Sequence, residues 1–77
     1  MEIKILAFGQ IAELIGQSEF SLADVKDTDS LNEWLAVNYP PISAVTYAIS
    51  VDKKKVIENT SLNYNSVVAL LPPFSGG

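Results

Sequence analysis

Three patterns in the chain predict an α+β fold with one main helix packed across a small mixed sheet. Apolar, β-branched runs typical of buried strands occupy residues 2–8 and 66–71. Residues 30–39 place apolar side chains at helical spacing behind a possible N-cap. Residues 45–51 alternate between apolar and polar side chains, as a half-buried strand does. Since a sheet must bury its apolar face against another layer, a two-layer arrangement follows.

The length and composition allow one small domain. The 77 residues lie near the lower limit for folding without a covalent or metal staple. The chain contains no cysteine, so neither a disulfide nor a thiolate metal site can supply that staple, and the redox compartment stays open. A hydrophobic fraction of 48% is enough for one core, so we expect a stable monomeric domain.

The charge balance argues against nucleic acid as a partner. Five lysines and nine acidic residues give a net charge of −4, and no basic stripe is present. Basic contacts to phosphate dominate nucleic-acid affinity, so we expect no nucleic-acid partner. No segment approaches the ~20 apolar residues that span a bilayer, and no charged-then-apolar leader opens the chain. We therefore expect a cytoplasmic protein without a membrane partner.

The first part of the chain predicts a strand, a short helix and a second strand. Both faces of residues 2–8 carry apolar side chains, as in a central strand, and Gly9 ends that strand. Residues 10–16 carry an apolar stripe at i, i+3 and i+4, with Gly16 as the C-cap. Residues 19–22 form the second strand, with its apolar side chains facing inward.

An acidic loop precedes the main helix. Its carboxylates come from Asp24, Asp27 and Asp29. A metal site is conceivable there, but the spacing lacks the calcium-loop pattern and its glycine, so a solvated loop is favoured. Ser30 and Glu33 match the S-x-x-E capping box, which predicts Ser30 as the N-cap of the helix. The acidic side chains also suit the positive end of the helix dipole.

The main helix is expected to present one apolar face to the sheet and to stop at two prolines. That face should comprise Leu31, Trp34 and Leu35, extended by Val37 or Tyr39. Trp34 is interpreted as a core side chain in preference to a ligand platform. Pro40 and Pro41 should end the helix at Tyr39, because the residue before a proline avoids the α region.

Beyond the helix, the pattern predicts a strand at residues 45–51 and a turn at residues 52–55. The three lysines of that turn could bind an acidic or nucleotide-bearing partner, but a solvated turn between two strands is the favoured interpretation. In the polar stretch that follows, Leu62 is the expected anchor to the core. Asn63 and Asn65 suit turn or left-handed conformations.

The last twelve residues predict a strand that leads into a slim tail. Pro72 and Pro73 stop the strand, because proline has a fixed φ and no N–H for the ladder. We therefore expect a domain at residues 1–71 and an extended tail at residues 72–77, which could reach roughly 20 Å beyond the sheet. A Gly-Gly end can pass through a channel that any Cβ would block, and it offers its carboxylate to another protein. A frayed chain end is the alternative interpretation.

Because the chain lacks two reactive residue types, we expect any catalysis to belong to a partner protein. The chain contains no histidine and no cysteine, so it lacks the usual general base and the strongest side-chain nucleophile. It cannot carry a persulfide. We therefore expect a non-catalytic chain that binds no metal and no cofactor of its own.

Residues 70–77, Leu-Leu-Pro-Pro-Phe-Ser-Gly-Gly, resemble the C-terminal signature of the molybdopterin synthase small subunit family, a group of ubiquitin-like sulfur carriers. Residues 3–8 and 11–16 are similar to that family's first strand and short helix. Many members carry a Gly/Asp-rich turn before the last strand, whereas this chain has Asn-Tyr-Asn-Ser at residues 63–66, so the turn type differs. The resemblance spans nearly the whole chain and implies a β-grasp, ubiquitin-like fold.

In a β-grasp fold the first and last strands pair in parallel at the centre of the sheet. Val68 and Leu70 would then face the helix. The side chains expected on the other face are Val67, Ala69 and Leu71, with Phe74 continuing the patch. An exposed apolar patch beside a tail is suited to docking.

The resemblance also implies a reaction at Gly77. An ATP-using adenylyltransferase of the ubiquitin-activating type would adenylate the Gly77 carboxylate, and a sulfurtransferase would convert it to a thiocarboxylate. The tail would enter the molybdopterin synthase large subunit and donate sulfur to a cyclic pyranopterin precursor. The partner-binding residues would be Gly76, Ser75, Phe74, Pro73 and Leu71. A heterotetramer of two small and two large subunits is implied as well.

Three other functions fit the same chain. The fold and the Gly-Gly end also serve sulfur carriers of thiazole (thiamine) biosynthesis, although Pro-Pro-Phe-Ser before the glycines is less similar to that branch. A ubiquitin-like protein modifier would use activated Gly77 to form an isopeptide bond with a lysine. A plain interaction domain with a dispensable tail is the third.

Overall fold

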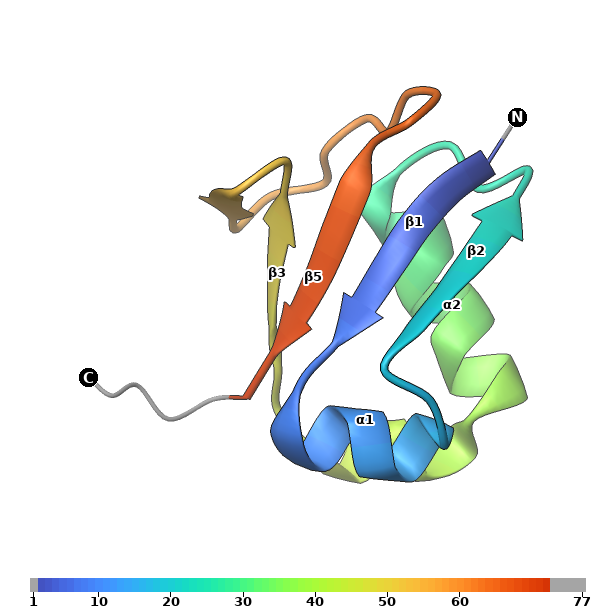
Figure 1. Cartoon of the computed structure of the whole chain (residues 1–77), viewed down its shortest axis with the longest axis vertical. Coiled ribbons are helices and arrows are strands. Elements are labelled where there is room, and N and C mark those ends of the chain that lie inside the picture. Colours follow the sequence, from blue (N-terminus) through green and yellow to red (C-terminus); the bar gives the residue numbers. More distant parts are fainter. Residues whose placement is uncertain (1, 73–77) are drawn as a thin grey trace.

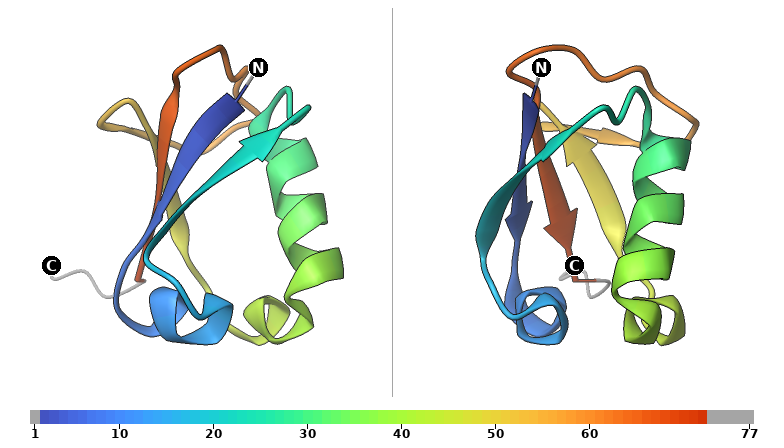
Figure 2. Two further views of the ribbon diagram at one scale, coloured as in Figure 1. Left: turned by 45° about the vertical axis from the view of Figure 1, so that its right-hand side comes forward. Right: turned by 90° about the vertical axis from the view of Figure 1, so that its right-hand side faces the viewer.

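The fold, described for residues 2–72 by a computed structural model, places one sheet beside one main helix (Figure 1). Within these residues five strands form a sheet in the order β2-β1-β5-β3-β4. The strands are β1 (Glu2–Ala7), β2 (Glu19–Ala23), β3 (Ala48–Val51), β4 (Lys54–Val56) and β5 (Val67–Leu71). The helices are α1 (Gly9–Ile15), α2 (Thr28–Asn38) and the 3-10 helix η1 (Pro40–Ala44). Since α2 covers one face of the sheet and α1 lies at its end (Figure 2), the predicted α+β arrangement is confirmed.

The centre of the sheet is the parallel pair β1–β5. Its register sets Ile5 beside Val68 and Ala7 beside Leu70, and all four side chains are buried. The β1–β2, β3–β5 and β3–β4 pairs are antiparallel, so the sheet is mixed, as predicted. Both central strands have ladder neighbours on each side, which suits their β-branched, apolar sequences.

The core lies between the sheet and α2. Its buried hydrophobic side chains are Ile3, Ile5, Ala7, Ile11, Ile15, Leu31, Leu35, Ile42, Ile49, Leu62, Val68 and Leu70. Leu31 and Leu35 confirm the predicted inward face of the main helix, and Leu62 is the predicted anchor of the long loop. The sequence pattern did not indicate Ile42, because a short 3-10 helix has no long apolar period to reveal its buried face.

Helix α2 begins earlier than the capping-box pattern predicts. Asp27 is its N-cap, and a carboxylate oxygen accepts a hydrogen bond from the Ser30 backbone N–H at 2.9 Å. The prediction that Ser30 caps the helix is therefore wrong. Asn59 favours the earlier start, because its side-chain oxygen accepts from the N–H of Asp29 at 2.8 Å and its amide donates to Asp27 at 3.3 Å. The loop after β4 thus satisfies a donor that the start of a helix leaves free.

Helix α2 ends just before Pro40 and Pro41, as predicted. Its last residue is Asn38, and Tyr39 is the C-cap. Val37 is 73% exposed, whereas Tyr39 packs edge-on against Trp34 with ring centroids 5.8 Å apart. Tyr39 therefore extends the apolar face, and the partly buried Trp34 packs against the core, as predicted. Within residues 2–72, no helix is long and apolar enough to cross a membrane.

Strand β3 is shorter than the strand predicted at residues 45–51, because it begins only at Ala48. The five residues of η1 occupy the stretch after α2 and delay the entry into the sheet. Just before β3, the hydroxyl of Tyr47 donates to the side-chain oxygen of Asn32 on α2 at 2.8 Å. Tyr47 is therefore held by the helix layer and not by a strand ladder.

The turn after β3 is tighter than predicted. Asp52 and Lys53 have φ values of 49° and 74°, the pattern of a two-residue type I′ hairpin turn. Lys54 and Lys55 therefore belong to β4 instead of the turn. Asn65 is left-handed as well, with φ 65°, which confirms the prediction for the turn before β5.

Candidate functional site: the end of β5 and the outer face of the sheet

The candidate site begins where β5 ends. Leu71 is the last residue of β5, is half-buried and pairs with Ala48 of β3. The other predicted site residues, Pro73, Phe74, Ser75, Gly76 and Gly77, lie outside the described residues. The described part of the site is therefore the root of the tail, Leu71 and Pro72, with the face of the sheet that leads to it.

Strand β5 presents alternate side chains to the two faces of the sheet. Val68 and Leu70 are fully buried on the side of α2. The half-buried residues of the opposite face are Val67, Ala69 and Leu71. Both orientations were implied by the family resemblance and are confirmed. Among residues 2–72, no helix lies over that opposite face (Figure 2).

Neighbouring strands widen this half-buried surface. Leu6 of β1 lies beside Ala69, and Ala48 of β3 lies beside Leu71. Phe8 follows Leu6 on the same face through extended backbone and is 45% exposed. We define the outer strip as Leu6, Ala48, Val67, Ala69 and Leu71. Partly exposed apolar surface of this kind is suited to contact with a partner protein.

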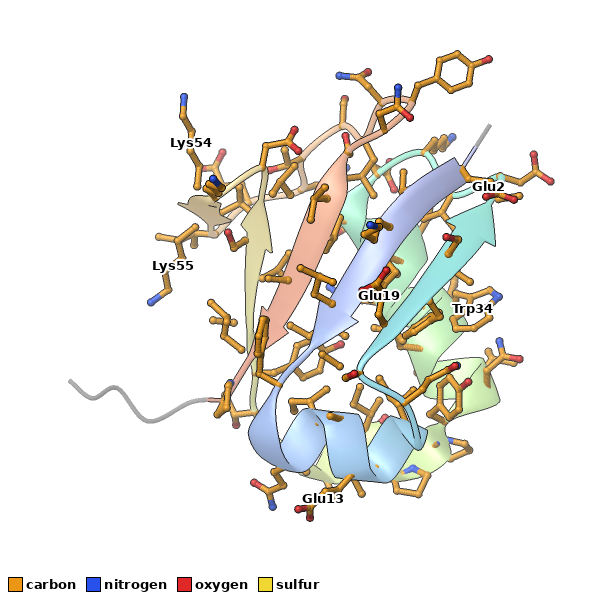
Figure 3. The ribbon with its side chains drawn as sticks, viewed as in Figure 1. Glu2, Glu13, Glu19, Trp34, Lys54 and Lys55 are labelled. Atoms are coloured by element: carbon orange, nitrogen blue, oxygen red, sulfur yellow. The ribbon has the colours of Figure 1, made fainter. Side chains whose placement is uncertain are left out.

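Charged side chains flank the outer strip towards both edges of the sheet. Lys4 of β1 and Glu19 of β2 form an ion pair at 3.3 Å. Lys54 and Lys55 both project from β4 at the opposite edge (Figure 3), but only Lys55, which pairs with Ser50, lies on the outer face, since Lys54 pairs with Val51 of the other face. The Lys4 and Glu19 side chains are both at least half exposed, so their pair adds little to stability. An apolar centre with a charged rim is the arrangement typical of protein interfaces.

Hydrogen bonds hold both ends of β5. At its start, the Asp52 carboxylate accepts from the Val67 N–H at 2.9 Å, and the Asp52 N–H donates to the Val67 carbonyl at 2.8 Å. At its other end, the Phe8 N–H donates to the Leu70 carbonyl at 3.2 Å. The strand is therefore a fixed base for the residues that follow it.

Gly9 lies against the root of the tail. Its φ is +53°, and a Cβ on Gly9 would lie 3.1 Å from Cγ of Pro72. The sequence pattern indicated Gly9 only as the residue that ends the first strand. No local signal could reveal the contact, because it joins residues far apart in the chain. Only the parallel pairing of the first and last strands, implied by the resemblance, brings the two together.

The titratable groups with shifted pKa values do not belong to the outer strip. Hydrogen bonds from Ser30 lower the pKa of the Asp27 carboxyl, and Asn59 and Lys26 act in the same direction. Burial raises the pKa of the Tyr47 hydroxyl. Within residues 2–72, no three His, Cys, Asp or Glu side chains gather as a metal site would require.

Two surface cavities formed by the described residues lie away from β5. One cavity of about 220 Å³ lies among the start of β1, the end of β2 and the loop at residues 62–64. Another, of about 290 Å³, lies between the start of α2 and the strands β3 and β4. Neither cavity is lined by a residue of β5 or by Pro72.

Comparison with known proteins shows the family. The ThiS family profile matches residues 5–77, which include the Gly-Gly end. This chain belongs to the ThiS family. The match, together with the relatives' names, confirms the resemblance to ubiquitin-like sulfur carriers from which the β-grasp fold and the function were inferred.

Relatives of this ThiS-family chain match it along its length. The molybdopterin synthase sulfur carrier subunit of Chlamydomonas reinhardtii is 29% identical over an 83-residue alignment that covers 100% of both chains. A chain in the solved complex of subunits 1 and 2 of the molybdopterin-converting factor from Helicobacter pylori is 25% identical, with a TM-score of 0.74 and 100% coverage of both. Small archaeal modifier protein 1 from Methanosarcina acetivorans is 25% identical, with a TM-score of 0.77, covering 99% of this chain and 96% of that chain. The shared architecture confirms the predicted β-grasp fold.

Proposed function

We propose that this chain is a cytoplasmic sulfur carrier of molybdenum cofactor biosynthesis and the small subunit of molybdopterin synthase. The observation that carries the proposal is the family match that extends through Gly76 and Gly77. The names of the Chlamydomonas and Helicobacter relatives support this pathway over thiazole biosynthesis. The lack of histidine and cysteine in the sequence supports a carrier whose own terminal carboxylate is the reacting group.

The Gly77 carboxylate needs activation before it can accept sulfur, because its negative charge resists attack by a nucleophile. In the proposed sequence, an adenylyltransferase joins the carboxylate to the α-phosphate of ATP with loss of pyrophosphate. Hydrosulfide, delivered by a sulfurtransferase, then attacks the acyl carbon and displaces AMP, so that a C–S bond replaces the C–O bond to phosphate and leaves a thiocarboxylate that is ionised at neutral pH. The ATP belongs to the activating partner, and the chain binds no cofactor of its own.

The domain delivers this thiocarboxylate to the large subunit. The outer strip supplies apolar contact, and the charges at its rim set the orientation of the complex. Since β5 is held at both ends, docking of the strip also places Leu71 and Pro72. The tail at residues 72–77 enters the partner, where the sulfur passes to a cyclic pyranopterin precursor. Along that path the partner contacts Pro73, Phe74, Ser75 and Gly76, in an assembly of two small and two large subunits.

Intact-mass analysis of the chain, expressed with its natural partners, tests the carrier chemistry. We expect the mass increase of one oxygen-to-sulfur exchange at the C-terminus. Incubation of the loaded chain with the large subunit and the pterin precursor then tests the pathway, because the sulfur should leave the chain as the dithiolene forms. A thiazole-synthesis assay with the same loaded chain is the control. A chain that supplies thiazole and not dithiolene would move the protein to thiamine biosynthesis.

Protein modification is the second candidate, because small archaeal modifier protein 1 of Methanosarcina acetivorans is 25% identical over nearly the whole chain. The same activated Gly77 would then form an isopeptide bond with a lysine amine and release AMP. Mass spectrometry of proteins that co-purify with a tagged chain under denaturing conditions would detect such lysine-linked adducts. Cells that make the dithiolene and contain no adducts would favour the carrier.

A further inference from the structure

Gly9 lies at the junction of β1 and α1, directly against the root of the tail. We propose that Gly9 is a positioning residue: the space left by its missing side chain seats the Pro72 ring, and this seat fixes the direction in which the chain leaves β5. The inference rests on the proposed function, because a fixed exit matters for a tail that must enter a partner's channel. The inference concerns Gly9 and Pro72, where the chain leaves the sheet, and not Gly76 and Gly77.

The backbone on either side of Gly9 is held firmly. The Phe8 N–H donates to the Leu70 carbonyl at 3.2 Å, which extends the β1–β5 contact past the last residue of β1. The Phe8 carbonyl accepts from the N–H groups of Ile11 and Ala12 at 3.1 and 3.4 Å, which ties it to the first turn of α1. Ile11 is fully buried and anchors that turn in the core. Gly9 therefore cannot shift without disturbing both elements.

The Pro72 ring rests on this fixed point. A Cβ on Gly9 would lie 3.1 Å from Cγ of Pro72, closer than the roughly 3.5–4.0 Å of ordinary carbon contacts. Because Gly9 is held from both sides, Pro72 is the partner that would have to move. Leu71 is paired with Ala48 in the ladder, so the displacement would fall on the bonds just after β5.

A proline at position 72 strengthens the effect of this contact on the direction of the chain. Its ring fixes φ, and it has no N–H with which to continue the ladder. The course of the chain after Leu71 is therefore set by the packing of the ring. A change of direction at Pro72 would be carried through the residues up to Gly77, a stretch that can span roughly 17 Å. A seated ring thus reduces the volume that the end of the tail must search, which is the general benefit of preorganisation.

Gly16, the glycine that follows α1, also has a positive φ but has no neighbour like Pro72, so it can distinguish the contact with Pro72 from the backbone requirement alone. Gly16 is the C-cap of α1 with φ +89°, and a Cβ there would meet nothing within 4 Å. Alanine strains the backbone at both glycines, because both occupy the left-handed region. Only at position 9 would the alanine side chain also displace Pro72. Gly16→Ala is therefore the matched control.

The test is sulfur transfer from the loaded chain to the pterin precursor on the large subunit, measured over a range of carrier concentrations. For Gly9→Ala we expect kcat/KM about tenfold below wild type and kcat within about twofold, because entry of the tail is impaired and the chemistry at Gly77 is not. Gly16→Ala should keep both constants within about twofold of wild type. Pro72→Ala, which removes the ring, should lower kcat/KM as Gly9→Ala does. In the double variant the losses should not multiply, since both changes break one contact.

Equal kcat/KM values for Gly9→Ala and Gly16→Ala would overturn the inference, and so would losses that multiply in the double variant. If Gly9→Ala does not fold, Pro72→Ala decides, and an unchanged kcat/KM for that variant overturns it. Nuclear Overhauser contacts between Gly9 Hα and the Pro72 ring protons in the free chain give a readout independent of sulfur transfer. Their absence would also overturn the inference. A wild-type chain that keeps these contacts and neither accepts nor donates sulfur would defeat the proposed function alone.

Discussion

Ile5 of β1 and Val68 of β5 lie side by side in the parallel pair at the centre of the sheet, and neither side chain is exposed to solvent. Leu31 and Leu35 of α2, also fully buried, belong to the same cluster. The strand that carries the tail is thus part of the hydrophobic core. The side chains that stabilise the domain therefore also hold the strand that leads to the proposed tail.

Shortening Val68 should destabilise the domain. Val68→Ala removes two methyl groups from a fully buried position, so we expect a loss of about 2 kcal/mol in the free energy of unfolding. Val67→Ala, next to it on the half-buried outer face, should cost less than about 1 kcal/mol. Urea unfolding of both variants measures the difference. Equal losses would contradict the assignment of the two faces.

The N-cap of α2 should make stability depend on pH. Hydrogen bonds from Ser30 hold the pKa of Asp27 below its usual value, so the ionised carboxylate stabilises the folded state. This stabilisation is complete above the unfolded pKa of about 3.9 and is lost as the pH falls through the lower folded pKa. We expect Asp27→Ala to lower Tm by roughly 5 °C at neutral pH. Its difference from wild type should shrink below about pH 4.

Thermal unfolding at a series of pH values measures this effect. Asp24→Asn is the control, because Asp24 lies in the same loop but outside the helix cap, and asparagine tolerates its φ of 63°. A Tm difference for Asp27→Ala that stays constant into strongly acidic solution would show that the charge of Asp27 contributes nothing to the cap.

Removing Gly77 should abolish sulfur transfer without changing stability. The new terminal carboxylate would belong to Gly76 and would fall about 3.5 Å short of the partner's reacting groups. Intact mass would report the loss of the thiocarboxylate, and urea unfolding would report an unchanged domain. The carrier proposal fails if the shortened chain still loads sulfur and supports dithiolene formation at the wild-type rate.

A charge at the end of the outer strip should weaken binding to the large subunit. Leu71→Asp places a carboxylate at the root of the tail, where the proposed interface is apolar, so we expect Kd to rise at least about tenfold. Ile57→Asp makes a similar change at a side chain that is 95% exposed and lies outside the strip, and it should change Kd less than about twofold. Calorimetric titration with the large subunit measures both. Similar losses for the two variants would place the interface elsewhere.

Features that depend on neighbouring residues were predicted well from the sequence. Pro40 and Pro41 end α2 at its C-cap Tyr39 through a local steric effect, so the pattern located that boundary. Asn65 adopts the left-handed conformation that its short polar side chain favours. The parallel pairing of β1 with β5, in contrast, was implied by the family resemblance and not by local patterns.

Features that depend on distant residues were missed. Asp27 and Ser30 both suit an N-cap, and the hydrogen bonds of Asn59, which arrive from the loop after β4, favour Asp27. The contact of Gly9 with Pro72 exists only because β1 and β5 run side by side. In each case the deciding contact joins residues that are far apart in the chain.

The parallel pairing of β1 with β5 has a consequence for synthesis on the ribosome. β1 is translated before the other strands and β5 after them, so the central ladder cannot form until nearly all of the sheet has emerged. Contacts so distant along the chain also slow folding, because a long loop must close first. During this interval the nascent chain exposes the free edge of β1 to chaperones and proteases. A product whose translation stopped before β5 would lack this ladder, so an activating enzyme that binds only the folded sheet would not bind it.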